Sequence, residues 1–180
     1  MSEPRRLHWG CGAVTPAGWV NSDRRRGRGV DLVCDIRDGF PLPDASFDYA
    51  VGIHALQDLP YLDLVPALRE LRRVLVPGGV LRLALPDLDR AIQAYLRGDS
   101  AYFRVPDHEV RSLGGKLCIQ MTWYGSLRSL FTHDCIEELA GQAGFTTVAR
   151  CEFGETRSPH PEIVALDDRR SESLFVEAVR

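Results

Sequence analysis

The feature that most constrains this chain is a series of short apolar segments that alternate with turn-rich connections. Each segment is too short to form a helix alone, and most are bounded by Gly, Pro or Asp. This rhythm is typical of a parallel α/β sheet. The expected strands are Arg6–Trp9, Trp19–Ser22, Asp31–Cys34, Phe47–Gly52 and Val80–Leu85.

One clear amphipathic helix is expected between the last two of these strands. Apolar residues recur at helical spacing from Leu64 to Leu75, and Pro77-Gly78-Gly79 stops the pattern. The tail offers two further strands that could pair in antiparallel fashion across a long Pro-containing connection. The remaining expected elements are helices over Leu88–Arg97, Ile119–Tyr124 and Asp134–Ala143 and strands over Thr146–Glu152 and Leu174–Val179.

Composition narrows the class of protein. The chain has 180 residues, of which 44% are hydrophobic and 26% charged, so we expect one globular domain over residues 1–180 and no disordered or coiled-coil protein. The net charge of -3 gives no overall attraction to nucleic acid or anionic membrane. The first residues include no apolar segment for export, and the five cysteines form no CxxC pair. We therefore expect a cytoplasmic protein with reduced thiols, no bound metal and no membrane partner.

A candidate ligand site lies where the expected parallel strands end. Gly10-Cys11-Gly12 follows the first strand, where small residues allow close approach of a ligand to the backbone, but the dinucleotide fingerprint fails because Thr15 stands at its third Gly position. Asp23 and Asp35 end the next two strands. A carboxylate at such a position can accept hydrogen bonds from both hydroxyls of a ribose, so these residues together indicate a nucleoside site. For Asp35, a role in a strand-end turn is an equal alternative.

The order of motifs resembles the class I S-adenosylmethionine-dependent methyltransferases, in particular small proteins with the type 11 methyltransferase domain. The resemblance covers nearly the whole chain and is densest from Leu7 to Asp87. It is carried by Leu7–Gly12, Gly18–Asp23, Cys34-Asp35-Ile36, Pro41–Asp48, Leu71–Gly79, Ala143-Gly144-Phe145 and Ser173–Ala178.

That resemblance implies a Rossmann-like methyltransferase fold with a mostly parallel seven-stranded sheet and an antiparallel last strand. It also implies S-adenosylmethionine as cofactor. The loop Gly10, Cys11 and Gly12 would contact its methionine part, Asp23 its ribose hydroxyls, and Asp35 with Ile36 its adenine.

Three departures from the family pattern are visible. His8 replaces an acidic residue common in the family, and Gln57-Asp58 replaces a common Glu-His pair. The connection Ala13–Gly18 leaves room for only a short first helix or none. A partner subunit, as in a homodimer, could complete such a site, and a catalytically inactive binding or scaffold protein is the alternative to an enzyme.

Candidate catalytic residues lie near the strand ends or before the last helix. Methyl transfer needs mainly proximity and orientation, but a general base helps if the acceptor is a hydroxyl. His54 and Asp87 follow the fourth and fifth strands, and His133 precedes the last helix. If His54 is the base, the reference pKa of histidine predicts a reaction rate that rises with pH through about 6.5. A structural role is the alternative for each.

Residues 98–132 are expected to form a lid or substrate-recognition insertion. Aromatic side chains cluster in Ala101–Arg104 and Met121–Tyr124, where they could hold a planar or apolar acceptor or simply pack between helices. The favoured acceptor is therefore a small molecule, in a reaction of specialised metabolism.

One dense basic run, Arg24-Arg25-Arg26-Gly27-Arg28, follows the expected ribose residue. A solvated loop is the simplest explanation. A substrate phosphate or carboxylate, or an RNA backbone, are the alternatives. No RNA-stacking aromatic motif adjoins the run, so RNA methylation is the minor hypothesis.

Overall fold

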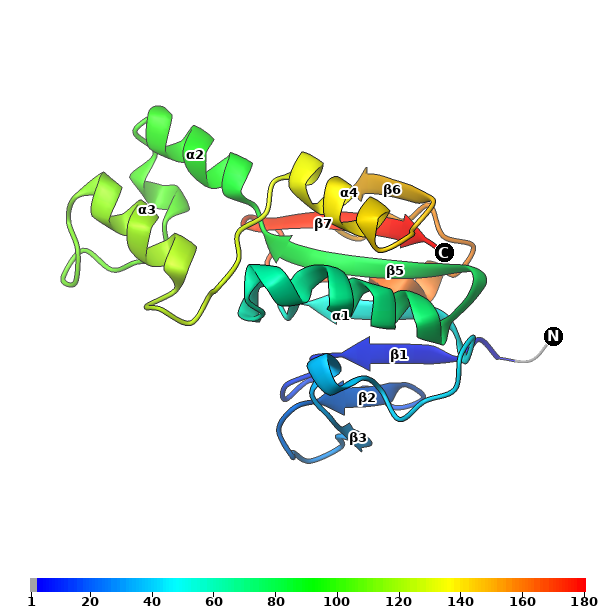
Figure 1. Cartoon of the computed structure of the whole chain (residues 1–180). Helices are drawn as coiled ribbons and strands as arrows, with labels where there is room; N and C mark the ends of the chain where they lie inside the picture. The colour runs from blue at the N-terminus through cyan, green and yellow to red at the C-terminus, as the bar shows by residue number, and fades with distance from the viewer. Residues whose placement is uncertain (1–2) are drawn as a thin grey trace.

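The computed structural model describes residues 3–180 and contains one mixed sheet of seven strands in the order β3-β2-β1-β4-β5-β7-β6 (Figure 1). The parallel strands are β1 (Arg6–Trp9), β2 (Val20–Asp23), β3 (Leu32–Val33), β4 (Phe47–Ile53) and β5 (Leu75–Pro86). Strands β6 (Thr147–Cys151) and β7 (Ser173–Val179) pair antiparallel to each other, and β7 pairs antiparallel to β5. This arrangement confirms the expected fold class.

The helices are unevenly distributed along the chain. The α-helices are α1 (Tyr61–Val74), α2 (Leu88–Leu96), α3 (Leu113–Thr122) and α4 (His133–Gln142). Short 3-10 turns are η1 (Ile36–Asp38), η2 (Leu56–Asp58), η3 (Ser100–Tyr102) and η4 (Pro161–Val164). Residues 10–19, all described, form turns and no helix between β1 and β2, as the short connection predicted.

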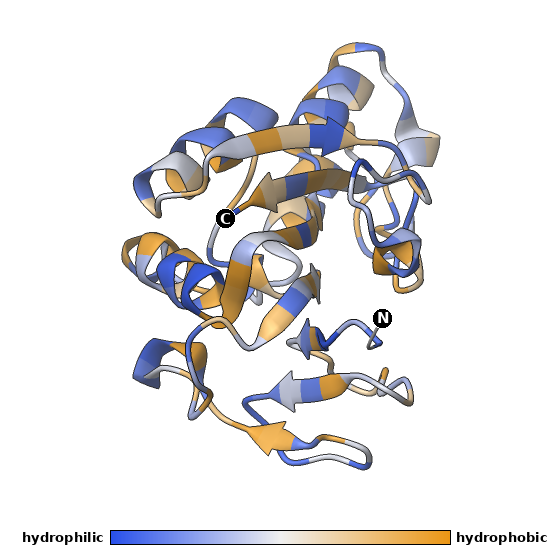
Figure 2. Ribbon diagram, turned by 90° about the vertical axis from the view of Figure 1, so that its right-hand side faces the viewer, coloured by the Kyte–Doolittle hydropathy of each residue, from blue (hydrophilic) through white to orange (hydrophobic). Residues whose placement is uncertain are grey.

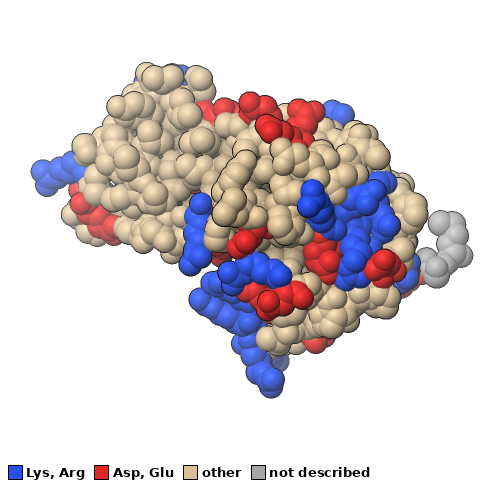
Figure 3. All heavy atoms as spheres, in the orientation of Figure 1, with Lys and Arg blue, Asp and Glu red and all other residues tan. Residues whose placement is uncertain are grey.

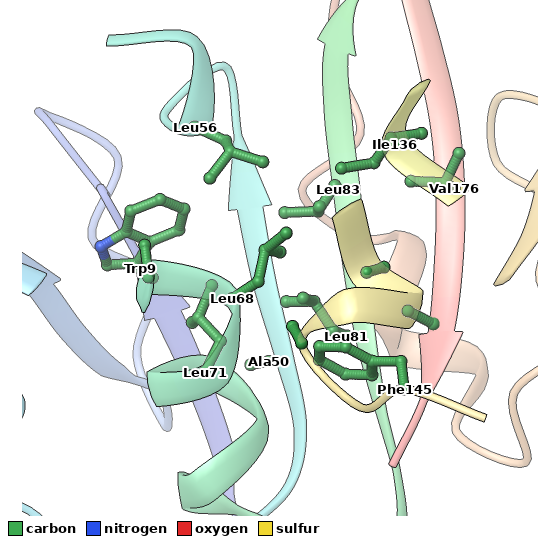
Figure 4. Packing of buried hydrophobic residues seen from close by; sticks show 14 of the residues in the cluster. Trp9, Ala50, Leu56, Leu68, Leu71, Leu81, Leu83, Ile136, Phe145 and Val176 are labelled. Carbon is green, nitrogen blue, oxygen red and sulfur yellow. The ribbon is translucent and has the colours of Figure 1, made fainter. Parts of the chain in front are cut away.

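The larger core lies between the sheet and the helices α1 and α4. Figure 4 shows Leu68 and Leu71 of α1 directed at Ala50 of β4 and Leu81 of β5, and all four are buried. Truncating a fully buried leucine such as Leu68 to Ala costs about 2–5 kcal/mol of stability. The banding of orange and blue residues along the helices in Figure 2 reflects this one-sided burial.

The opposite face of the sheet is covered by the connection between β6 and β7. Its Ile163, in η4, packs against Tyr49 and Val51 of β4. Arg82 of β5 is fully buried on the sheet and forms ion pairs with Asp167 at 2.6 Å and Glu177 at 2.8 Å. Because an unpaired charge is costly in the interior, the ion pair with Asp167, which belongs to this connection, holds the connection against the sheet.

Two predicted element starts differ from the structure by more than three residues. Strand β5 begins at Leu75, directly after α1, because Phe47 of β4 pairs with Leu75 before a register shift restores regular pairing at Tyr49. Helix α3 begins at Leu113, earlier than predicted, where the Ser112 side chain accepts a hydrogen bond from the Gly115 N–H and caps the helix.

Helices α2 and α3 lie beyond the ends at which the arrows of β1 and β5 point (Figure 1). The carboxyl ends of parallel strands are the edge at which such sheets bind ligands. The segment between β5 and α4 is therefore placed beside the expected site.

Candidate functional site

A cavity of about 250 Å³ lies at the carboxyl ends of β1, β2 and β4, and we call it the strand-end cavity. The structure brings together here five of the six residues expected to hold a cofactor, the exception being Cys11. The cavity is lined by Trp9, Gly10, Gly12, Asp23, Arg24, Cys34, Asp35, Ile36, His54, Ala55, Asp58 and Leu59.

The two glycines of the first loop meet different constraints. Gly10 has φ +66°, and a Cβ there would lie 2.4 Å from the Cβ of Ala55, so no larger residue fits. Gly12 has φ +54°, and no atom lies within 4 Å of the position of its missing Cβ. The loop is therefore tight against the protein at Gly10 and open at Gly12, as close approach of a ligand requires.

Asp23 organises the loop and keeps capacity for a ligand. Its Oδ2 accepts a hydrogen bond from the Gly12 N–H at 2.9 Å, and its Oδ1 accepts one from the Arg25 N–H at 2.8 Å. A carboxylate offers about four acceptor sites, so about two remain. This is the number needed for the two hydroxyls of a ribose.

Asp35 is more fully engaged. Its carboxylate accepts hydrogen bonds from the backbone N–H of Arg37 at 3.0 Å and from Nε and Nη2 of the same residue at 2.9 and 2.6 Å. These contacts lower the pKa of the Asp35 carboxyl to about 2. Asp35 therefore stays ionised, and about one acceptor site is left for an adenine amino group.

A second cavity, of about 240 Å³, adjoins the first, and we call it the insertion cavity. Half of its lining comes from the segment between α2 and α4, including Tyr102 and Gln120. A role of residues 98–132 as a lid or substrate-recognition insertion stays a prediction. The lining residues are His54, Gln57, Asp58, Pro86, Tyr102, Gln120, Met121, Trp123, Ser126, Leu127, Arg169 and Glu172.

His54 lines both cavities. It follows β4 with φ +49°, a left-handed conformation that is strained for a non-glycine residue. Its Nε2 lies 2.7 Å from Oγ of Ser173, whose hydroxyl has the Asp168 carbonyl as acceptor at 3.4 Å. In the tautomer that satisfies both contacts, Nε2–H donates to Ser173 and Nδ1 keeps a lone pair.

The pKa of His54 differs from the value expected from sequence. Burial, with a further contribution from the Arg169 charge, lowers this pKa to about 4. The imidazole is therefore neutral at physiological pH and can accept a proton, although as a weaker base than an ordinary histidine. The predicted pH profile of the rate, centred near pH 6.5, is therefore wrong for a base with a pKa of about 4.

Asp58 is the second residue common to both cavities, and sequence analysis noted it only as a departure from the family pattern. Partial desolvation raises the pKa of its carboxyl, whereas the charges of Arg24, Arg25 and Arg128 oppose the shift. No sequence motif around Asp58 predicts this position, because the second cavity forms only where residues 120–127 pack beside Asp58.

Three candidate residues lie outside the lining of these two cavities. Cys11 is buried and lines a neighbouring hollow with Gly10, Gly12 and His54. Asp87 caps α2 by accepting a hydrogen bond from the Arg90 N–H at 3.0 Å and pairs with Arg150 at 2.9 Å, which gives it a structural task. His133 is the first residue of α4 and is half-buried. The geometry therefore favours His54 over Asp87 and His133 as a base.

The basic run forms an exposed loop after β2. Figure 3 shows Lys and Arg side chains gathered on this side of the molecule. Arg24, Arg25, Arg26 and Arg28 line a shallow hollow with Gly12, Asp23 and Asp58. Within residues 3–180, none of these four arginines forms an ion pair, as a solvated loop predicts.

Comparison with known proteins agrees with the fold and the motifs. A family model described as "Methyltransferase domain" matches residues 7–83. The ubiquinone/menaquinone biosynthesis C-methyltransferase UbiE of Methylobacterium nodulans is 30% identical over 132 residues, which are 70% of this chain and 49% of that protein. The chain thus spans about half the length of this curated relative.

Solved structures show the same fold. A SAM-dependent methyltransferase from Thermotoga maritima superposes with a TM-score of 0.60 at 18% identity, covering 99% of this chain and 83% of the other. The 1,6-didemethyltoxoflavin-N1-methyltransferase of Burkholderia thailandensis, solved with bound 1,6-didemethyltoxoflavin and S-adenosylhomocysteine, gives a TM-score of 0.57 at 14% identity, covering 98% of this chain and 71% of that one.

These observations define the class of protein as one with the Rossmann-like methyltransferase fold. Together with the match over residues 7–83 and the 30% identity to UbiE, they show that the chain is similar to class I S-adenosylmethionine-dependent methyltransferases. In the described part of the chain, no helix has the length and apolar character needed to span a membrane.

Proposed function

We propose that this protein transfers a methyl group from S-adenosylmethionine to a small-molecule acceptor. The observation that carries the proposal is the meeting of the strand-end cavity and the insertion cavity at His54 and Asp58. A methyl donor in one cavity and an acceptor in the other would face each other at this junction.

The residues of the strand-end cavity fit the cofactor. Gly12 leaves open space, Asp23 keeps about two acceptor sites, and the buried Ile36 offers an apolar wall for adenine. When bound, S-adenosylmethionine supplies a methyl group already activated on a sulfonium. The protein therefore contributes mainly by orientation and exclusion of water.

His54 and Asp58 are the groups placed to handle the acceptor proton. An acceptor that carries a hydrogen would have to release one proton when it receives the methyl group. His54 is neutral because its pKa is about 4, so it can take that proton or orient the acceptor through a hydrogen bond. Asp87 and His133 are not included in this proposal.

The test is a product assay. Incubation with S-adenosylmethionine and a panel of aromatic and heterocyclic metabolites should yield one product heavier by a methylene unit, with an equal amount of S-adenosylhomocysteine, by mass spectrometry. The catalytically inactive scaffold remains the alternative, since Gln57-Asp58 departs from the family pattern. Absence of product and of cofactor binding would support the scaffold.

A further inference from the structure

The imidazole of His54 is bound to a second side chain that has no solvent access. Its Nε2 lies 2.7 Å from Oγ of Ser173, the first residue of β7, which is fully buried. The two residues are 119 positions apart in the sequence, so the contact exists only in the packed sheet. Ser173 therefore holds one edge of the His54 ring from inside the protein.

Strand β5 fixes the backbones of both partners. The His54 N–H donates to the Ala84 carbonyl of β5 at 2.9 Å, and Ser173 pairs with Pro86 at the end of the same strand. Both side chains thus extend from residues that are anchored to one central strand. The distance between the His54 ring and the Ser173 hydroxyl is therefore set by the sheet.

The backbone of His54 gives independent evidence that this position is held. Its φ of +49° lies in the left-handed region, which costs free energy for a non-glycine residue. Such conformations persist only where the surrounding contacts over-determine them. The hydrogen bonds of His54 to Ala84 and Ser173 are contacts of this kind.

The Ser173 hydroxyl also has a second partner. The Asp168 carbonyl lies 3.4 Å from Ser173 Oγ and can only accept a hydrogen bond. When Ser173 donates to Asp168, its Oγ accepts from His54, and the ring hydrogen of the neutral imidazole lies on Nε2. The hydrogen bond at one ring nitrogen thereby sets the state of the other.

The other ring nitrogen, Nδ1, is available to a ligand. Within residues 3–180, Nδ1 of His54 has no protein hydrogen-bond partner and is not one of the polar atoms that lack both a partner and solvent access. The His54 side chain lines both cavities. With the hydrogen on Nε2, Nδ1 is the ring atom that can accept a proton.

We propose that Ser173, supported by the Asp168 carbonyl, is a positioning residue for His54: it keeps the ring hydrogen on Nε2 and the Nδ1 lone pair available where the two cavities meet. This inference rests on the proposed function, because it concerns the base named there. Ser173 lines neither cavity and is fully buried, so it acts only through His54.

The test observes the His54 ring directly by proton–nitrogen NMR at pH 7 and needs no acceptor. The His54 signals are assigned by their absence from His54→Ala. We expect the wild type to carry the ring hydrogen on Nε2. In Ser173→Ala this hydrogen should exchange with water roughly three- to tenfold faster, as loss of one neutral hydrogen bond predicts.

Two results would overturn the inference. One is a wild-type ring hydrogen on Nδ1, which is measured without any variant and therefore decides the matter even if Ser173→Ala does not fold. The other is unaltered exchange at Nε2 in a folded Ser173→Ala.

Two further variants separate positioning from a general loss of packing. Ser173→Thr keeps the hydroxyl and should keep the slow exchange at Nε2. Ser158→Ala is the matched control, because it removes a serine hydroxyl that accepts from the His160 N–H at 3.1 Å in the same connection between β6 and β7. Exchange as fast in either of these as in Ser173→Ala would contradict a specific role of the Ser173 hydroxyl.

Turnover distinguishes this inference from the proposed function. On an acceptor identified by the product assay, Ser173→Ala should lower kcat roughly three- to tenfold and should have no further effect in a His54→Ala background. A further loss in the double variant would show that Ser173 acts independently of His54 and overturn the inference. Absence of product and of S-adenosylhomocysteine binding, together with slow exchange at Nε2, would refute the proposed function and leave the hold of Ser173 on the His54 ring supported.

Discussion

In the strand-end cavity, Asp23 and Asp35 accept hydrogen bonds from the protein itself, whereas within residues 3–180 three buried polar atoms of residues that line the insertion cavity have no protein partner. Asp23 binds two backbone N–H groups and Asp35 binds Arg37, so the first site is preorganised. Gln57 and Gln120, which line the second cavity, each carry one buried polar atom without a hydrogen-bond partner. A site preorganised by its own contacts suits an invariant cofactor, whereas around the second cavity the protein leaves part of its hydrogen-bonding capacity unused.

The first prediction concerns a variant that disrupts the strand-end cavity and leaves the insertion cavity unchanged. Gly10→Val places a branched side chain against Ala55 at φ +66°, where the Cβ alone would lie 2.4 Å from the Ala55 Cβ. We expect loss of S-adenosylhomocysteine affinity by at least about 100-fold, measured by calorimetry.

The control for Gly10→Val is Gly141→Ala in α4, where no atom lies within 4 Å of the new Cβ. This variant should keep its cofactor affinity and gain roughly 0.5–1 kcal/mol of stability in denaturant unfolding. Unaltered affinity in Gly10→Val would show that the loop does not hold the cofactor.

The second prediction concerns the junction of the cavities. His54→Ala should lower turnover of the acceptor by about 100-fold, the lower end of the range for a general base, because a base of pKa about 4 is weak. Since the pKa is lowered, His54 is neutral above about pH 4 and becomes protonated only below it. The titration of His54 should therefore leave the wild-type rate unchanged from pH 6 to 8 and lower it only near pH 4. An inflection of the rate near pH 6.5 that disappears in the variant would contradict this assignment.

The third prediction weakens the cofactor site without closing it. Asp23→Ala removes the acceptor for two backbone N–H groups and for the ribose, so the dissociation constant for S-adenosylhomocysteine should rise more than tenfold. Asp23→Asn keeps one acceptor oxygen and should fall between the wild type and Asp23→Ala. An unchanged constant in both variants would remove Asp23 from the ribose role.

The smallest effect is expected from the basic loop. Replacing Arg24, Arg25, Arg26 and Arg28 together by Gln should change neither the unfolding midpoint nor the cofactor affinity appreciably, because exposed charges contribute little. An RNA substrate would behave differently: the wild type would then bind RNA with a steep salt dependence that the variant loses. Filter binding at two salt concentrations decides between these outcomes.

The two cavities also differ in how far sequence could predict them. Gly10, Gly12, Asp23 and Asp35 each lie at or just after the carboxyl end of a short strand, and parallel strands end at one edge, so their convergence was predictable from local pattern. Gln57, Tyr102 and Gln120 come from three segments whose relative packing no spacing encodes, and their convergence was not predicted.

For His54, the position was predictable from sequence but the pKa was not. Its position after β4 was predicted, but its lowered pKa depends on burial and on Arg169, which is distant in sequence. The structural contacts of Asp87 could not be predicted from sequence either. Its carboxylate accepts hydrogen bonds from the Arg90 N–H at the start of α2 and from Arg150 of β6. Strand ends can be placed from sequence, whereas the electrostatic state of a side chain there requires the packed structure.

The most direct test is a crystal structure of the protein with S-adenosylhomocysteine. We expect the nucleoside to lie between Asp23 and Ile36, with the sulfur directed at the junction formed by His54 and Asp58. The insertion cavity should remain open for the acceptor. A ligand bound elsewhere, or one whose sulfur faces away from that junction, would contradict the claim that the two cavities form one methyl-transfer site.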